Sequence, residues 1–225
     1  MALSRITVLI SGRGSNLGAL IAHARDGGID GAITHVISNR PEAAGLSIAR
    51  EAGIATTVID HLGHDARETF DAALAGAIDA SDSNLIVLAG FMRVLTTGFV
   101  QRYAGRLINV HPSLLPLYPG LHTHRRALAD GVRIHGCSVH YVTADVDIGP
   151  IIAQGAVPVL PDDDEATLAA RVLAVEHRLL PAAVAWHCAG RLTIEGQRVR
   201  LKDEHTGDRD ALLVPPSPFA ASAWS

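Results

Sequence analysis

Asn109 and His111, separated by one residue, are side chains that could act together on a carbonyl group. They lie at the end of an apolar run and just before Pro112, and side chains two positions apart in an extended chain point to the same side. An amide donor and an imidazole that converge on one point could stabilise a developing oxyanion, which addition to a carbonyl requires. Asp147 could pair with the imidazole, and a carboxylate partner raises the pKa of a histidine. This spacing favours carbonyl chemistry, and a purely structural Asn-x-His pair is the alternative.

The glycine-rich loop Ser11–Asn16 could bind an anion, because it lies between a predicted strand and a predicted helix. Small residues let backbone N–H groups approach a ligand, and a helix N-terminus adds partial positive charge. The dinucleotide-binding fingerprint is Gly-x-Gly-x-x-Gly, and Gly18 lies one position too late to be its third glycine. The second strand ends at Asn39-Arg40 and not at the acidic residue that would bind a ribose, so a dinucleotide site is disfavoured. The loop therefore predicts a site for a phosphate monoester, and a tight turn without a ligand is the alternative.

Other catalytic chemistries lack the residues that they need. The sequence has no Gly-x-Ser-x-Gly elbow, and neither Cys137 nor Cys188 has a histidine at a useful spacing, which disfavours covalent acyl transfer. Several of the twelve histidines could be considered as metal ligands. These are His122, His124, His135 and His140. They lack a His-x-x-Glu-His motif and a cysteine partner, so we expect no metal site.

The composition indicates a folded protein in a reducing compartment. Of 225 residues, 48% are hydrophobic and 19% charged, which is enough apolar surface for a core. The net charge of −4 and the 4% of aromatic residues argue against general nucleic-acid binding. Two distant cysteines argue against a disulfide scaffold, and no apolar run reaches the roughly 18 residues of a membrane span. No signal peptide is visible, and we expect a cytoplasmic protein.

Apolar runs that alternate with helix-period stretches predict a parallel sheet with helices on both faces. We expect strands at residues 5–10, 33–38, 84–89, 106–110, 137–143 and 151–160, and a hairpin at 191–201. Pro41 is expected to open one helix and Asp65 to cap another, and a helix over 162–189 would be kinked by Pro181. The Pro-rich stretch 111–123 is expected to be a functional loop.

Five segments of the chain resemble the folate-dependent formyltransferases and together span about residues 5–200. They are ISGRGSNL (10–17), LAGFMRVL (88–95), NVHPSLLPLYPGLHTH (109–124), HGCSVHYVTADVDIGPII (135–152) and AVEHRLLP (174–181). The Asn-x-His-Pro-Ser-Leu-Leu-Pro motif with a later Asp-x-Gly-Pro is specific to this group. The Gly-Arg-Gly-Ser-Asn loop narrows the resemblance to the branch that acts on glycinamide ribonucleotide.

The resemblance implies a single-domain, Rossmann-like α/β fold: a mostly parallel twisted sheet with helices on both faces and an antiparallel C-terminal part. The catalytic domain would comprise residues 1–204, and residues 205–225 would be a poorly ordered tail. The implied reaction transfers the formyl group of 10-formyltetrahydrofolate to the amine of glycinamide ribonucleotide in de novo purine (IMP) synthesis. No bound cofactor is expected, because the folate is a co-substrate. The partners would be these small molecules, without nucleic acid or membrane, and the chain would be a monomer or a homodimer.

The resemblance also implies three groups of site residues. The catalytic set would be Asn109, His111 and Asp147, with the amine attacking directly, Asn109 and His111 meeting the oxyanion, and Asp147 raising the pKa of His111. The ribonucleotide would be bound by Gly14, Ser15, Asn16, Pro112 and Glu176. The folate would be bound by Arg67, Met92, Arg93, Val94, Leu95, Asn109, Thr143, Ala144, Asp145, Val146 and Asp147.

Two positions depart from the pattern of the group, and other functions remain as alternatives. Ala144 replaces an acidic or bulkier residue, and Ile148 replaces a small one in the loop behind Asp147. The nearest rivals are formyltetrahydrofolate deformylase and methionyl-tRNA formyltransferase, which normally carry an additional domain for which this chain is too short. A non-catalytic nucleotide-binding module is the rival from another class, and the off-register glycine counts against it.

Overall fold

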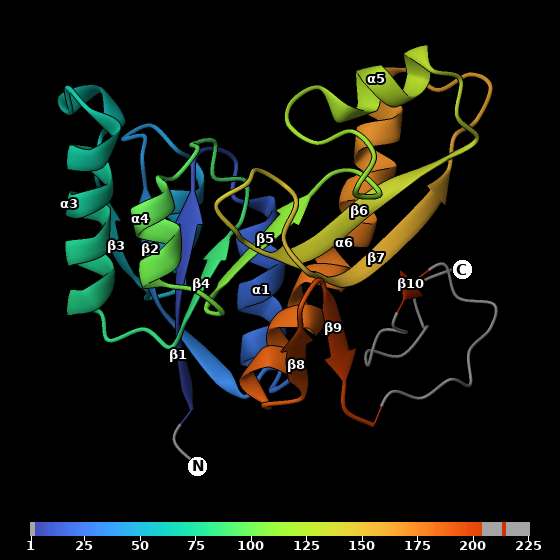
Figure 1. Ribbon diagram of the computed structural model, residues 1–225. Coiled ribbons are helices and arrows are strands. Elements are labelled where there is room, and N and C mark those ends of the chain that lie inside the picture. The colour runs from blue at the N-terminus through green and yellow to red at the C-terminus, as the bar shows by residue number, and fades with distance from the viewer. Residues whose placement is uncertain (1–2, 204–212, 215–225) are drawn as a thin grey trace.

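One twisted sheet forms the centre of the structure, with its strands in the order β3-β2-β1-β4-β5-β6-β7-β9-β8 and β10 paired to β7 (Figure 1). The computed structural model describes residues 3–203 and 213–214. The strands are β1 (Ser4–Ile10), β2 (Gly31–Ser38), β3 (Ala55–Val58), β4 (Leu85–Leu88), β5 (Leu107–His111), β6 (Ile134–Tyr141), β7 (Ile151–Pro158), β8 (Leu192–Glu195), β9 (Arg198–Leu201) and β10 (Leu213–Val214).

The strand directions divide the sheet into two parts. β3, β2, β1, β4 and β5 run parallel, whereas β6 pairs antiparallel with both β5 and β7. β9 pairs parallel with β7, and β8 and β9 form the hairpin expected at the end of the domain. The central strand β4 is covered on both faces and all its residues are buried, whereas the edge strand β3 is partly exposed. The predicted fold class, a mostly parallel sheet followed by an antiparallel part, is confirmed.

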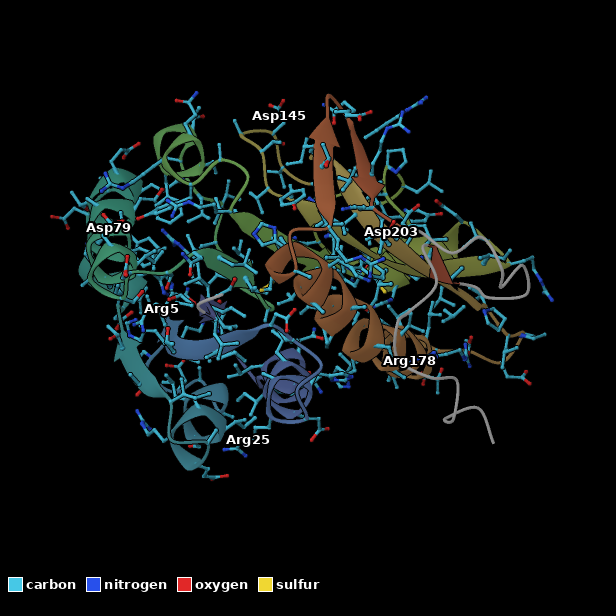
Figure 2. All side chains as sticks on the ribbon, turned by 90° about the horizontal axis from the view of Figure 1, so that it is seen from below. Arg5, Arg25, Asp79, Asp145, Arg178 and Asp203 are labelled. Atoms are coloured by element: carbon cyan, nitrogen blue, oxygen red, sulfur yellow. The ribbon has the colours of Figure 1, made fainter. Side chains whose placement is uncertain are left out.

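Helices cover both faces of the sheet. α1 (Ser15–Arg25), α2 (Gly45–Glu51) and α6 (Glu165–Cys188) pack on one face, where the larger core cluster lies, and α1 and α6 lie side by side (Figure 2). α3 (Arg67–Ala80) and α4 (Thr97–Arg102) cover the other face and enclose a second apolar cluster (Figure 1). The 3-10 helix η1 (His61–Gly63) and α5 (Thr123–Ala129) lie in connections.

Two predicted helix starts are wrong. The helix expected from Pro41 begins only at Gly45, because the preceding turn packs on the glycine loop, where the Gly45 N–H donates to the carbonyl of Gly12 at 3.0 Å. Asp65 does not cap α3, whose N-cap is Ala66 without a side-chain hydrogen bond. The burial of Phe70 and the residues after it along one face stabilises that helix, so it does not depend on a cap.

α6 lies within the predicted helix 162–189 and continues through Pro181, and the kink expected at Pro181 stays a prediction. Asp164 caps it in a capping box with Thr167. β3, α4 and α5 were not predicted, and each is seven residues or shorter. Apart from β10, the predicted tail 205–225 lies outside the described residues, so its disorder and the domain limit at residue 204 stay predictions. Within the described part of the chain, no helix is long and apolar enough to cross a membrane.

Candidate active site

A cleft of about 760 Å³ opens where β4, β5 and β6 adjoin the N-terminus of α1 and the loop between β6 and β7. In open α/β sheets the crevice outside the carboxyl ends of the strands is where ligands bind. Most of the predicted site residues line this cleft. They are Asn16, Met92, Arg93, Val94, Leu95, Asn109, His111, Pro112, Thr143, Ala144, Asp145, Val146, Asp147 and Glu176.

His111 and Asp147 form the pair that the sequence indicated. Nδ1 of His111, the last residue of β5, lies 3.3 Å from Oδ2 of Asp147, and the two side chains are 7% and 11% exposed. Asp147 has a left-handed backbone with φ of 57°, in a loop that passes so close to Tyr141 that a Cβ on Gly149 would lie 1.7 Å from the Tyr141 carbonyl oxygen. The same carboxylate oxygen accepts a hydrogen bond from the Gly120 N–H at 2.8 Å. The carboxylate is therefore fixed by its own loop and by the loop after β5.

Both ring nitrogens of His111 face hydrogen-bond acceptors. Nδ1 faces the Asp147 carboxylate, and Nε2 lies 2.9 Å from the carbonyl oxygen of Tyr118. A neutral imidazole carries one N–H donor, whereas the imidazolium carries two. The neutral ring can donate to only one of these acceptors at a time, whereas a protonated ring could donate to both.

His140 is a part of the site that the sequence analysis considered only as an unsupported metal ligand. Asn109 and His140 are paired across β5 and β6, and Nδ2 of Asn109 lies 3.2 Å from Nε2 of His140. Nδ1 of His140 contacts the Tyr141 carbonyl at 3.0 Å, and burial lowers the pKa of the ring. The neutral ring therefore donates from Nδ1 and accepts from the Asn109 amide at Nε2. No sequence signal could have shown this, because it depends on the register of the two strands.

The N-terminus of α1 forms the second part of the site. Gly14 is the N-cap with φ of 78°, and a Cβ there would lie 2.5 Å from the Cα of Gly45. Asn16 lines the cleft, and its Nδ2 donates to Oε2 of Glu176 at 2.7 Å. Burial raises the pKa of Glu176, and the Asn16 hydrogen bond opposes that shift. Oδ1 of Asn16 is buried and has no hydrogen-bond partner in the described part of the chain, so a donor from a ligand could satisfy it.

The segment after β4 forms an apolar wall of the cleft. Met92 and Val94 of this segment line the cleft, as does Val146 of the loop between β6 and β7. Their side chains are each about half exposed, at 57%, 50% and 48%. The Met92 N–H donates to Oγ of Ser11 at 2.7 Å, and that hydroxyl donates to Oδ1 of Asn39 at 2.5 Å. Ser11 thus ties this wall to the end of β1. Exposed apolar side chains beside fixed backbone groups can hold a flat aromatic ligand.

Three predicted site residues lie outside the lining of the cleft. Gly14 and Ser15 lie just before Asn16 at the start of α1, and Arg67 is the exposed first residue of α3. Their assigned roles stay predictions.

The lining of the cleft also contains residues that sequence reasoning did not assign to a ligand: Arg40, His140, Glu165 and the segment 120–124. Among residues 3–203 and 213–214, no group of three or more His, Cys, Asp or Glu side chains is arranged to hold a metal ion. Asp145 lies in the loop of residues 142–150 (Figure 2).

Comparisons with known proteins agree with this geometry. The family model "Formyl transferase" matches residues 4–184. The chain is 46% identical over 216 residues to phosphoribosylglycinamide formyltransferase of Escherichia coli (strain K12), covering 96% of this chain and 98% of that protein. It also covers 14% of the longer trifunctional purine biosynthetic protein adenosine-3 of Drosophila melanogaster, with 51% identity over 183 residues.

Solved structures give the same result. Glycinamide ribonucleotide transformylase 1 from Symbiobacterium toebii superposes with a TM-score of 0.88 at 48% identity, over 90% of this chain and 95% of that one. A formyltetrahydrofolate deformylase from Pseudomonas syringae superposes with a TM-score of 0.83 at 25% identity, over 89% of this chain and 66% of that one. The family match extends over most of the chain and includes the residues of the cleft, so the chain belongs to the formyl transferase family.

Proposed function

We propose that this enzyme transfers the formyl group of 10-formyltetrahydrofolate to the amine of N1-(5-phospho-D-ribosyl)glycinamide, a step of de novo purine (IMP) synthesis. One observation carries the proposal: a single cleft contains the His111–Asp147 pair, a helix N-terminus suited to phosphate and an apolar wall suited to a pterin. Gly14, Ser15, Asn16, Pro112 and Glu176 would bind the ribonucleotide. The Escherichia coli relative named phosphoribosylglycinamide formyltransferase, which this chain matches over nearly its whole length, supports the assignment.

The chemical step we infer is direct and leaves no covalent intermediate on the protein. The free amine of the glycinamide attacks the formyl carbon, a new C–N bond forms, and the carbonyl oxygen becomes an oxyanion. The bond between the formyl carbon and N10 of the folate then breaks. The proton lost from the attacking nitrogen is taken up by N10, which gives tetrahydrofolate and the formylated amide.

Asn109 and protonated His111 are the groups that we propose for the oxyanion. The Asn109 amide has two N–H donors, and one of them is directed to His140, which leaves the other for the substrate. Nε2 of His111 contacts the Tyr118 carbonyl in this structure, so the oxyanion would replace that carbonyl as the acceptor. Asp147 would hold the imidazole in place and balance its charge.

The folate would lie against the segments 92–95 and 143–147. Ala144 exposes no side-chain functional group there, so backbone groups of that loop would contact the pterin. Arg67 and Arg93 are the cations that we assign to the folate side, and the Arg93 guanidinium lies 5.1 Å from the centre of the Phe70 ring. The reaction needs only these two small molecules, and we propose that the enzyme acts in the cytoplasm, as a monomer or a homodimer, without a metal or a bound cofactor.

Hydrolysis of the same folate is the second candidate, because a deformylase shares the fold. Water would then replace the amine as the nucleophile, and free formate would be released. The Asn16–Glu176 pair argues against hydrolysis, because a buried carboxylate bound to a helix N-terminus has no role in attack by water.

An assay with purified enzyme and 10-formyltetrahydrofolate separates these reactions. We expect tetrahydrofolate to form only when glycinamide ribonucleotide is present, in a one-to-one ratio with formylated ribonucleotide and without free formate. Folate consumption that releases formate and does not depend on the ribonucleotide would establish the hydrolase instead. No consumption in either case, with the folded state confirmed by circular dichroism, would favour a non-catalytic binding module.

A further inference from the structure

Arg40 lines the active-site cleft, although nothing in the sequence assigned it to a ligand. It follows β2 directly, and its backbone is held by Ser38, whose hydroxyl accepts from the Arg40 N–H at 3.1 Å and donates to the Arg40 carbonyl at 2.7 Å. The preceding residue, Asn39, is fixed by the Ser11 hydroxyl at 2.5 Å. These contacts place Arg40 beside the glycine loop.

The turn that contains Arg40 packs directly on the N-terminus of α1. The Gly45 N–H donates to the Gly12 carbonyl at 3.0 Å, and Gly14 and Gly45 approach so closely that neither has room for a Cβ. Arg40 and Asn16 line the same cleft from the two sides of this contact. A cationic side chain and a helix N-terminus therefore face one space.

The exposed Arg40 guanidinium has no hydrogen bond or ion pair with any other residue in the described part of the chain, so it is available to a ligand. Arg93, the other arginine of the cleft lining, lies over the Phe70 ring. Asn16 contributes a buried Oδ1 atom without a partner, and this side chain is 8% exposed. Asn16 and Arg40 thus each bring a polar group without a protein partner to the lining of this cleft.

A phosphate monoester carries nearly two negative charges, whereas a helix N-terminus offers only about half a positive charge. Glu176 adds a carboxyl group nearby, and burial raises its pKa. A guanidinium can bind two phosphate oxygens at once through its planar set of donors. Arg13 of the glycine loop does not line the cleft, whereas Arg40 does, so Arg40 is the arginine placed to supply this charge.

We propose that Arg40 binds the phosphate group of the ribonucleotide and is the residue that selects the phosphorylated substrate. This inference rests on the proposed function. The backbone N–H groups at the start of α1 bind the phosphate at one side, and the Arg40 side chain supplies the full positive charge from the neighbouring turn. Arg40 takes no part in formyl transfer itself, so its removal should change substrate affinity rather than turnover.

The test compares Arg40→Gln, Arg40→Lys and the control Arg50→Gln, which removes an exposed arginine from the last turn of α2. For Arg40→Gln we expect the KM for glycinamide ribonucleotide to rise about tenfold, equivalent to about 1.4 kcal/mol. The kcat and the folate KM should stay unchanged. Arg40→Lys should lie between the wild type and Arg40→Gln, and Arg50→Gln should match the wild type.

The same enzymes are then assayed with the dephosphorylated substrate, glycinamide ribonucleoside. We expect the wild type and Arg40→Gln to have the same kcat/KM on it, because the group that Arg40 binds is missing. An unchanged ribonucleotide KM in Arg40→Gln would overturn the proposal, and so would an equal loss on both substrates or an equal loss in Arg50→Gln. Wild-type enzyme that shows no ribonucleotide-dependent turnover would instead contradict the proposed function.

Discussion

Asn109 and His140 face each other across β5 and β6, and the amide nitrogen of Asn109 donates to the imidazole of His140 at 3.2 Å. The imidazole can accept because its other nitrogen donates to the Tyr141 carbonyl and burial keeps it neutral by lowering its pKa. This contact decides which end of the Asn109 side chain is the amide donor. A donor aimed at the oxyanion before the reaction begins is worth more than one that must reorient.

His140 should therefore act as a positioning residue for Asn109. We expect His140→Phe to lower kcat about 10- to 100-fold, because the amide loses its fixed orientation, with little change in either KM. His140→Gln should recover part of the activity, since its side-chain oxygen can accept from the amide. Steady-state kinetics with both substrates would check this, with the folded state followed by thermal unfolding. A kcat for His140→Phe equal to that of the wild type would refute the role.

Asp147 is in contact with two histidines and one backbone amide. Its oxygens lie 3.3 Å from Nδ1 of His111 and 3.7 Å from Nε2 of His140, and the Gly120 N–H donates to it at 2.8 Å. Asp147→Asn keeps the size but removes the charge that we propose to balance a protonated His111. We expect kcat to fall about 100-fold or more, with both KM values within a factor of about three. Single-turnover measurements should show the loss in the chemical step, and a loss confined to KM would assign Asp147 to binding alone.

Glu176 is predicted to lower the stability of the folded protein while it contributes to ribonucleotide binding. Burial raises its pKa, so the folded state holds the proton more tightly than the unfolded chain, and this stabilisation is lost as the pH rises through the raised pKa. At pH 8, Glu176→Gln should increase the free energy of unfolding by about 1 kcal/mol, or about 2–4 °C in Tm. The ribonucleotide KM should rise.

The gain in Glu176→Gln should shrink towards low pH, where the wild-type carboxyl becomes protonated. Glu51→Gln, which removes an exposed carboxylate at the end of α2, is the control and should leave Tm nearly unchanged. Thermal unfolding at several pH values measures both variants. Loss of stability at pH 8 in Glu176→Gln would mean that the carboxylate is needed by the fold.

Burial lowers the pKa of several histidines, which makes folding stability sensitive to acid. They are His35, His124, His135, His140, His177 and His187. His135 is 1% exposed, and desolvation lowers its pKa to about 4. Because these folded pKa values lie below the unfolded value of 6.5, the unfolded chain takes up protons first as the pH falls. The free energy of unfolding should therefore decrease below about pH 6.5.

The contribution of His135 extends from pH 6.5 down to about pH 4 and amounts to at most about 3 kcal/mol. His135→Gln should reduce the steepness of this acid loss, while at pH 8, where the wild-type ring is neutral in both states, the comparison isolates packing alone. Urea denaturation between pH 4 and pH 8 measures the difference. Parallel curves for the wild type and His135→Gln would show that other groups cause the acid sensitivity.

Elements with a clear hydrophobic pattern could be predicted. The run Leu85–Ala89 is apolar from end to end and forms the buried strand β4, and the stripe Leu168, Val172 and Leu179 forms the buried face of α6. α4 could not be predicted in this way. It spans only six residues and begins where the Thr96 hydroxyl accepts from the Phe99 N–H, which is too short for a period to be recognised.

Residues of the candidate site could likewise be predicted where a local pattern identified them, but not where their position depends on tertiary contacts. Asn109 and His111 could be identified together because the period of a strand places them on one side, and their motif marked a family. His140 and Arg40 could not, because the first depends on the antiparallel register of β6 and the second on the contact between Gly14 and Gly45. Neither relationship is local in the sequence.

The contact between Gly14 and Gly45 also explains which glycine of the phosphate loop is required. A Cβ on Gly14 would lie 2.5 Å from the Cα of Gly45, and the φ of 78° is unfavourable for any other residue. A Cβ on Gly12 would meet no atom within 4 Å, and the same holds for Gly18. Of these three glycines, packing therefore requires only Gly14.

Gly14→Ala and Gly12→Ala therefore form a matched pair in one loop. Gly14→Ala should lower the free energy of unfolding by about 2–4 kcal/mol, because the methyl group overlaps backbone that cannot move independently and the left-handed φ adds strain. Gly12→Ala should change it by less than about 0.5 kcal/mol. Urea denaturation measures both. Where Gly14→Ala still folds, its ribonucleotide KM should rise more than its folate KM, because the displaced N-terminus of α1 is the part that we propose to bind phosphate. Equal stability of the two variants would contradict the close approach of Gly14 and Gly45.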